Sequence, residues 1–174
     1  GGYVVGALDA TRCPINRPNG PPKYGNSFFS FKDQRECLKY DLAVSLGPQT
    51  RIIYLSNAFP GGFADIEITR LEFLPMLGDD ECIVADKGYQ DDDEPLILSP
   101  VKEYAGEPLN DIALEYNRAI HKKRQIVERV NKRIKQFGAF NVAWRHSLEL
   151  HELCFTVACQ LTNLFLEYEP MNQK

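Results

Sequence analysis

The chain has 174 residues, a net charge of −4, and 44% hydrophobic and 25% charged residues, which is the profile of one globular domain with its own core. It contains no apolar run of about 18 residues and no charged-then-apolar leader, so the sequence predicts neither a transmembrane helix nor a signal peptide. An apolar strand pattern begins directly at Tyr3, which suggests a domain cut from a longer protein.

The cysteines and histidines do not indicate a metal site. The five cysteines are odd in number, widely spaced and without a C-x-x-C pair, and the three histidines lack H-x-x-x-H spacing. We therefore expect free buried thiols in a reducing compartment, and neither a structural zinc site nor a histidine-based metal site.

The first half of the chain predicts strands. Residues 3–9 form an apolar strand that should end at Asp9, before a loop rich in Pro, Gly and Asn over residues 13–26. Residues 36–46 and 51–59 are two further strand patterns separated by the turn sequence GPQT. This arrangement predicts an antiparallel hairpin.

The middle of the chain alternates a helix with short strands. Residues 65–77 have apolar positions at helical spacing, and Gly78 should end that helix. Residues 82–86 are a short apolar strand ending on Asp86, and residues 96–100 are compatible with one more strand.

Two long helices follow. Residues 110–137 carry apolar side chains at helical spacing, and a second helix covers 145–168 before Pro170 stops it. Strands followed by long helices predict an α/β or α+β layer fold in which helices flank a mixed central sheet, and we favour the α/β class.

Asp9 and Asp86 share a context, because each stands at the carboxyl end of a short apolar strand. Sites in open α/β sheets are built at that edge, and adjacent carboxylates there are tolerated when one is protonated or a cation is bound. Oxygen ligands without Cys or His favour Mg²⁺ or Mn²⁺. The alternative is that aspartate simply prefers strand ends and turns.

The segment 118–135 is strongly basic. It carries +7, the remainder of the chain carries −11, and Glu128 is its one acid. Helical geometry places His121, Arg124, Glu128 and Lys135 within an arc of about 60°, opposite the apolar face. This face is compatible with a solvated surface, or with a metal-binding carboxylate among cations that hold phosphates.

Two strand aspartates and one helix glutamate are the ligands that a two-metal phosphodiesterase needs. In such enzymes the metals activate a water or a 3′-hydroxyl and stabilise the attacking and leaving oxygens at phosphorus.

Five phrases in order resemble the DDE transposase domain of Harbinger/PIF-type elements and their domesticated nuclease relatives. They are LDATRCPINRP, AFPGGFADIEI, ADKGYQ, NRAIHKKRQIVERVNKRIKQF and WRHSLELHELCFTVACQLTNL. The resemblance covers nearly the whole chain and implies a ribonuclease-H-like fold in a single catalytic domain, residues 1–174.

The resemblance also implies roles for particular residues. The catalytic, metal-binding triad is Asp9, Asp86 and Glu128. The contacts to DNA phosphates are His121, Arg124, Lys132 and Lys135, with His121 standing where the family signature has tyrosine. Asp65 lies outside the triad and is expected to support it.

The family implies two Mg²⁺ or Mn²⁺ ions, DNA as the partner, no membrane, an upstream DNA-binding region that this chain lacks, and a nuclear location if the host is eukaryotic. Oligomeric assembly stays open. The chain departs from the family at Phe63 and Ala64, where Ser and His are usual, and in segment 27–40, which lacks a histidine and several lysines.

The leading hypothesis is a metal-dependent DNA endonuclease or strand transferase. The alternative is a domesticated, non-cleaving protein that keeps the fold as a DNA- or protein-interaction module. The departures from the family pattern favour this alternative. A small-molecule phosphohydrolase is a third hypothesis, but the chain has no D-x-D nucleophile phrase and the basic helix would be unexplained.

Overall fold

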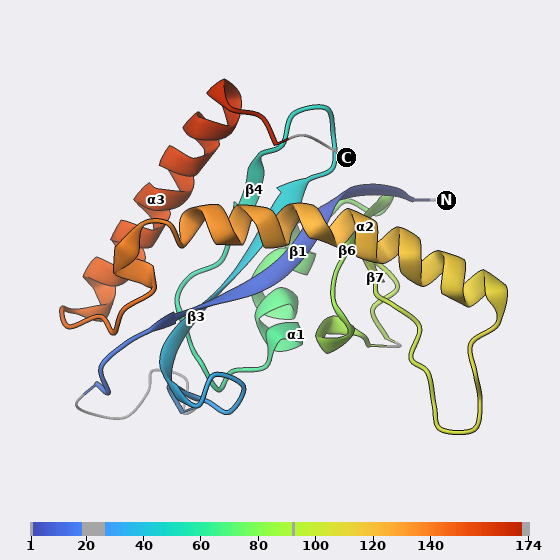
Figure 1. Ribbon diagram of the computed structural model, residues 1–174, viewed down its shortest axis with the longest axis horizontal. Coiled ribbons are helices and arrows are strands. Elements are labelled where there is room, and N and C mark those ends of the chain that lie inside the picture. Colours follow the sequence, from blue (N-terminus) through green and yellow to red (C-terminus); the bar gives the residue numbers. More distant parts are fainter. Residues whose placement is uncertain (1, 19–26, 92, 172–174) are drawn as a thin grey trace.

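A mixed sheet with helices on both faces forms the centre of the protein (Figure 1). The computed structural model describes residues 2–18, 27–91 and 93–171, so part of the predicted loop 13–26 lies outside the described residues. The strands are β1 Tyr3–Pro14, β2 Phe29–Ser30, β3 Arg35–Ser45, β4 Ile52–Leu55, β5 Phe59–Pro60, β6 Glu81–Val84 and β7 Ile97–Leu98.

The sheet order is β2-β3-β1-β6-β7, with β4 and β5 also pairing with β3. β1 is antiparallel to β3 and parallel to β6, and β6 is parallel to β7. The predicted hairpin is present as β3 and β4, which are antiparallel. The α/β fold with a mixed central sheet is therefore confirmed, and its topology is consistent with the ribonuclease-H-like fold.

β1 is longer than its sequence pattern predicts. It continues to Pro14, which pairs with Cys37, so the prediction that the strand ends at Asp9 is wrong. The reason is that Thr11 and Cys13 continue the buried alternation, and β3 offers hydrogen-bonding partners along this whole length. Asp9 thus lies within a strand.

The predicted helix over residues 65–77 is helical but irregular. It comprises α1 Asp65–Ile68, a π-helical turn η1 Thr69–Phe73 and a 3₁₀ turn η2 Leu74–Met76. Pro75 has no amide hydrogen to continue the ladder, and the chain is extended at Leu77, before the predicted stop at Gly78.

The two long helices are confirmed with shifted ends. α2 is Asp111–Ile134, and its N-cap is Asn110, whose side chain accepts a hydrogen bond from the Ala113 amide at 2.8 Å. α3 is Leu148–Tyr168, with Ser147 as its N-cap. Short 3₁₀ turns η3, Lys87–Tyr89, and η4, Gly138–Phe140, complete the elements. No helix in the described ranges is both long and apolar enough to cross a membrane.

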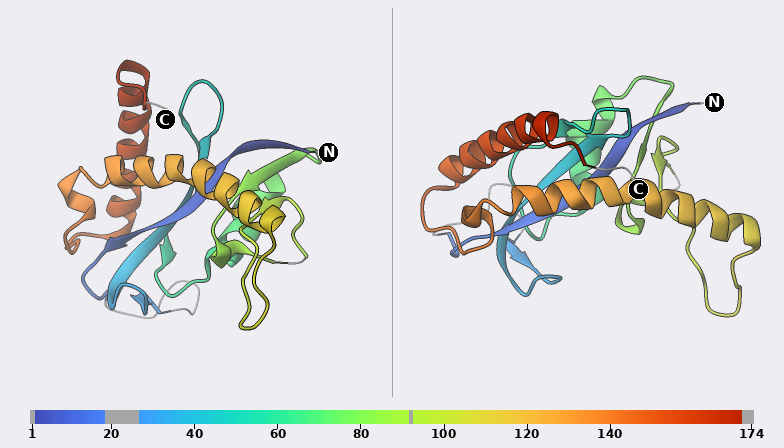
Figure 2. Two further views of the ribbon diagram at one scale, coloured as in Figure 1. Left: turned by 45° about the vertical axis from the view of Figure 1, so that its right-hand side comes forward. Right: turned by 45° about the horizontal axis from the view of Figure 1, so that its top comes forward.

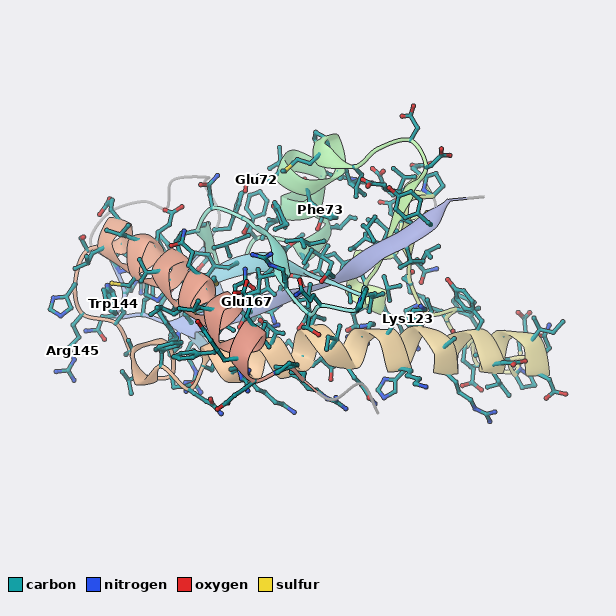
Figure 3. The ribbon with its side chains drawn as sticks, turned by 90° about the horizontal axis from the view of Figure 1, so that it is seen from above. Glu72, Phe73, Lys123, Trp144, Arg145 and Glu167 are labelled. Carbon is teal, nitrogen blue, oxygen red and sulfur yellow. The ribbon has the colours of Figure 1, made fainter. Side chains whose placement is uncertain are left out.

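The sheet separates two apolar clusters. α2 and α3 pack on one face, and the helical segment that starts with α1 packs on the other, where Phe73 lies between this segment and the sheet (Figures 2 and 3). Neighbouring residues of β1 divide accordingly: Ala7 belongs to the α2 side and Leu8 to the α1 side. The five cysteines are free thiols; the predicted burial holds for Cys13, Cys37 and Cys159, whereas Cys82 and Cys154 are half-buried.

Candidate active site

Asp9 and Asp86 lie at the same level of neighbouring parallel strands. The last residue pair between β1 and β6 is Ala7 with Val84, and each aspartate stands two residues beyond it. β6 ends at Val84, so Asp86 is on the loop just past the strand. The sheet therefore brings the two predicted aspartates to one edge of the β1–β6 pair.

Glu128 joins them from α2, which crosses this face of the sheet (Figure 1). The guanidinium of Arg124 links two of the acids: Nη1 lies 3.2 Å from Asp86 Oδ1 and Nη2 lies 3.5 Å from Glu128 Oε1. The Arg124 side chain is only 12% exposed, whereas Asp86 and Glu128 are 45% and 39% exposed. Arg124 is thus packed between acids rather than extended into solvent.

Asp9 is held by α2 through a residue that sequence reasoning missed. Asn131 Nδ2 donates a hydrogen bond to Asp9 Oδ2 at 3.0 Å. Burial raises the pKa of Asp9 to about 6; Arg124 and the Asn131 hydrogen bond oppose this shift, while the charges of Glu128 and Asp65 add to it. Asp9, Glu128 and Asp65 therefore share one electrostatic environment.

The donor chemistry of this site fits a hard divalent cation, because carboxylate oxygens are the ligands that Mg²⁺ and Mn²⁺ prefer. Within residues 2–18, 27–91 and 93–171, no three acid, His or Cys side chains form a ready-made metal cluster. The position between Asp86 and Glu128 is taken by Arg124. A bound cation would take over the charge neutralisation that Arg124 provides.

Asp65 sits at the start of α1, on the other side of β1. It accepts from Arg12 Nη2 at 3.3 and 3.2 Å, and its Oδ1 lies 2.5 Å from Lys39 Nζ. Lys39 is buried and also donates to the Phe63 carbonyl. A Cβ on Gly88 would lie 3.8 Å from Asp65 Oδ2, so this carboxylate reaches the loop that carries Asp86.

A second buried network, also missed, anchors that loop. Asp41 of β3 is fully buried and accepts hydrogen bonds from Thr69 Oγ1 at 2.8 Å and from the Tyr89 hydroxyl at 3.0 Å. The Tyr89 amide donates to the Asp86 carbonyl at 2.9 Å. In the sequence, Asp41 is an acid within the predicted strand 36–46. That pattern indicates a strand but does not indicate which side chains bind the carboxylate.

The other predicted phosphate contacts lie along α2 with differing exposure. His121 and Lys132 are exposed, and Lys135 is half-buried at the C-cap. The Nε2 atoms of His121 and Gln125 are 3.4 Å apart. These side chains and Arg124 flank Glu128 along the helix.

The fold and the site together define a class of protein: an α/β domain of ribonuclease-H-like topology with acids from two adjacent strands and one covering helix at a single edge. Residues 8–163 match the family described as DDE superfamily endonuclease, and the chain belongs to that family. The family's members typically use divalent metals.

A similar protein is the probable transposase for insertion sequence element IS702 from Microchaete diplosiphon. It is 32% identical over 144 residues, which cover 80% of this chain and 49% of the relative. The chain therefore spans about half the length of that relative. No solved structure matches the chain.

Proposed function

We propose that residues 1–174 form one catalytic domain of a metal-dependent DNA endonuclease or strand transferase, in which Asp9, Asp86 and Glu128 bind the metal. The observation that carries this proposal is the Arg124 guanidinium, which forms ion pairs with both Asp86 and Glu128. Besides burial, the charge of Glu128 also raises the pKa of Asp9, so Asp9 belongs to the same group of acids. Family membership supports phosphodiester chemistry.

Two Mg²⁺ or Mn²⁺ ions, when bound, would supply Lewis-acid stabilisation of the attacking and leaving oxygens at phosphorus. The chain's own residues prepare the acids. Asn131 orients Asp9 and favours its charged form, and Arg124 forms ion pairs with Asp86 and Glu128. If a bound cation balanced the charge of these acids, the Arg124 guanidinium would be available to contact a DNA phosphate.

The DNA strand is proposed to follow the exposed side of α2, with His121, Lys132 and Lys135 contacting phosphates. The printed name of the similar protein, a probable transposase for an insertion sequence element, supports DNA as the substrate. We assign the chain to the Harbinger/PIF type within the family, with a DNA-binding region elsewhere in the complete protein and, in a eukaryotic host, a nuclear location.

The same Arg124 ion pairs are also compatible with a second function. Arg124 occupies the position between Asp86 and Glu128, which is also the arrangement expected of a domesticated, non-cleaving module that keeps its acids neutralised. Such a module would bind DNA without cutting it.

The experiment is a nicking assay on supercoiled plasmid with the full chain in Mg²⁺ or Mn²⁺. The wild type should nick, and Asp86→Asn should lose at least about 100-fold in rate because a neutral amide replaces a charged carboxylate ligand. Asp93→Asn, which changes an exposed acid nearby, is the matched control. Equal nicking by wild type and Asp86→Asn would rule out cleavage at this site, and DNA binding without nicking would favour the second function.

A further inference from the structure

A small polar pocket lies at the end of the β1–β3 pair, away from the carboxylates. Its volume is about 170 Å³. Residues that line it include Arg12 and Pro14 from β1, Arg35 and Cys37 from β3, and Lys135 at the C-cap of α2. Three elements thus bring three cationic side chains to one hollow.

Two ion pairs, one with an acid of the pocket lining and one with an acid outside it, balance the charge of Arg12. Its Nη2 lies 3.2 Å from Asp65 Oδ2, and its Nε lies 3.5 Å from Asp33 Oδ2, where Asp33 is the acid of the pocket lining. Asp65 also pairs with the buried Lys39. Two acids therefore balance two bases, and this cluster carries no net charge.

Arg35 and Lys135 remain as surplus charge. In the part of the chain that the structure describes, neither forms an ion pair with an acid. Arg35 Nε donates to the Asp33 carbonyl at 3.2 Å, which fixes the guanidinium at the rim. The pocket therefore presents two positive charges over a polar floor, which suits a singly charged phosphodiester.

The pocket lies further along β1 and α2 than the candidate active site. Asp9 and Arg12 are three residues apart on β1, and Glu128 and Lys135 are seven apart on α2, each about 10 Å along its element. Both elements lead the same way, since Asn131 contacts Asp9 and Lys135 shares the pocket with Arg12. A DNA strand covers that distance in roughly two to three nucleotides.

We propose that this pocket binds one phosphodiester group of the DNA strand, two to three nucleotides from the phosphate at the carboxylates, with Arg35 and Lys135 supplying the charge. The inference rests on the proposed function, which makes DNA the ligand. It also gives a role to segment 27–40, which lacks the family's usual histidine and lysines but contributes Arg35.

The test is DNA binding by the full chain carrying Asp86→Asn, so that the probe is not cut. Fluorescence anisotropy with a labelled duplex of about 20 base pairs is measured without divalent metal between about 50 and 200 mM KCl. Arg35→Gln should weaken binding roughly 3- to 10-fold and reduce the magnitude of the salt slope by about 0.9, the value for one lost phosphate contact. Arg35→Lys should restore most of both.

Arg51→Gln is the matched control, because Arg51 follows the opposite end of β3 and is 52% exposed in a pair with Glu167. Affinity and slope that are the same for Arg35→Gln and Arg51→Gln overturn the pocket proposal. If the wild type nicks DNA all the same, the proposed function survives that result. If Arg35 governs binding but the wild type does not nick, the pocket stands and the proposed function falls. A chain that does not bind DNA removes both.

Discussion

Asn131 Nδ2 donates a 3.0 Å hydrogen bond to Asp9 Oδ2 and so ties α2 to the middle of β1. This bond and Arg124 are the two interactions that oppose the burial-driven rise of the Asp9 pKa. The balance decides whether Asp9 is ionised near neutral pH, and a carboxyl group binds a cation only when it is ionised.

Asn131→Ala should therefore raise the pKa of Asp9 above its value of about 6, because burial remains while a hydrogen bond to the charged form is lost. Carboxyl ¹³C NMR titration of Asp9 measures this shift. Asn117→Ala serves as the control, since Asn117 is on the same helix but contacts the backbone of Val101. A pKa that stays constant or falls in Asn131→Ala contradicts the assignment.

Tyr89→Phe should lower the free energy of unfolding by about 1–3 kcal/mol, since it leaves buried Asp41 without one of its two side-chain donors. It should also slow nicking, because the Asp86 loop loses its anchor on β3. Tyr54→Phe is a matched control, as the Tyr54 hydroxyl is buried without a hydrogen-bond partner in the described residues. Equal urea denaturation midpoints for the two variants would argue against the anchor.

The Asp41 network should make stability depend on pH. Burial raises the pKa of Asp41 to about 7, above its ordinary value of 3.8, so the folded chain holds a proton that the unfolded chain releases. The resulting stabilisation is complete below pH 4 and is lost as the pH rises through 7. When the pH falls from 8 to 5, the free energy of unfolding of the wild type should rise by about 2–3 kcal/mol relative to that of Asp41→Asn. Denaturant unfolding at both pH values measures this difference, and parallel pH profiles for the two proteins would refute it.

Asp65→Asn should destabilise the fold by about 3–5 kcal/mol, because the buried Lys39 ammonium would lose its carboxylate partner. Glu67 lies two residues from Asp65 and forms an exposed ion pair with Arg70. Glu67→Gln removes that charge and should lower the free energy of unfolding by less than about 1 kcal/mol. Thermal unfolding of the two variants gives the comparison. Similar melting temperatures would mean that Lys39 does not depend on Asp65.

The sequence predicted those parts of the fold that depend on local pattern. The hairpin, the strand before Asp86 and both long helices follow from periodicity, and α2 begins at the Asn110 cap. The predicted end of β1 was wrong. Asp9 has the sequence context of a strand end, but β3 pairs with β1 beyond it. Strand length there is set by a partner, not by local residues.

The candidate site divides in the same way. Asp9, Asp86 and Glu128 were predicted from strand ends, charge pattern and resemblance, and their roles remain predictions. Asn131 and Asp41 could not be given partners from sequence, since their hydrogen bonds join residues 122 and 48 positions apart. Arg124 was predicted to contact phosphate, whereas its ion pairs to Asp86 and Glu128 depend on how α2 lies across the sheet.

The central claim is that Glu128 completes a metal-binding triad with Asp9 and Asp86. The most direct measurement is Mn²⁺-dependent plasmid nicking by wild type, Glu128→Gln and Glu115→Gln, where Glu115 is an exposed acid on the same helix. Wild type and Glu115→Gln should nick at similar rates, and Glu128→Gln should lose at least about 100-fold in nicking rate while still binding DNA. Nicking by Glu128→Gln at the wild-type rate would contradict this claim.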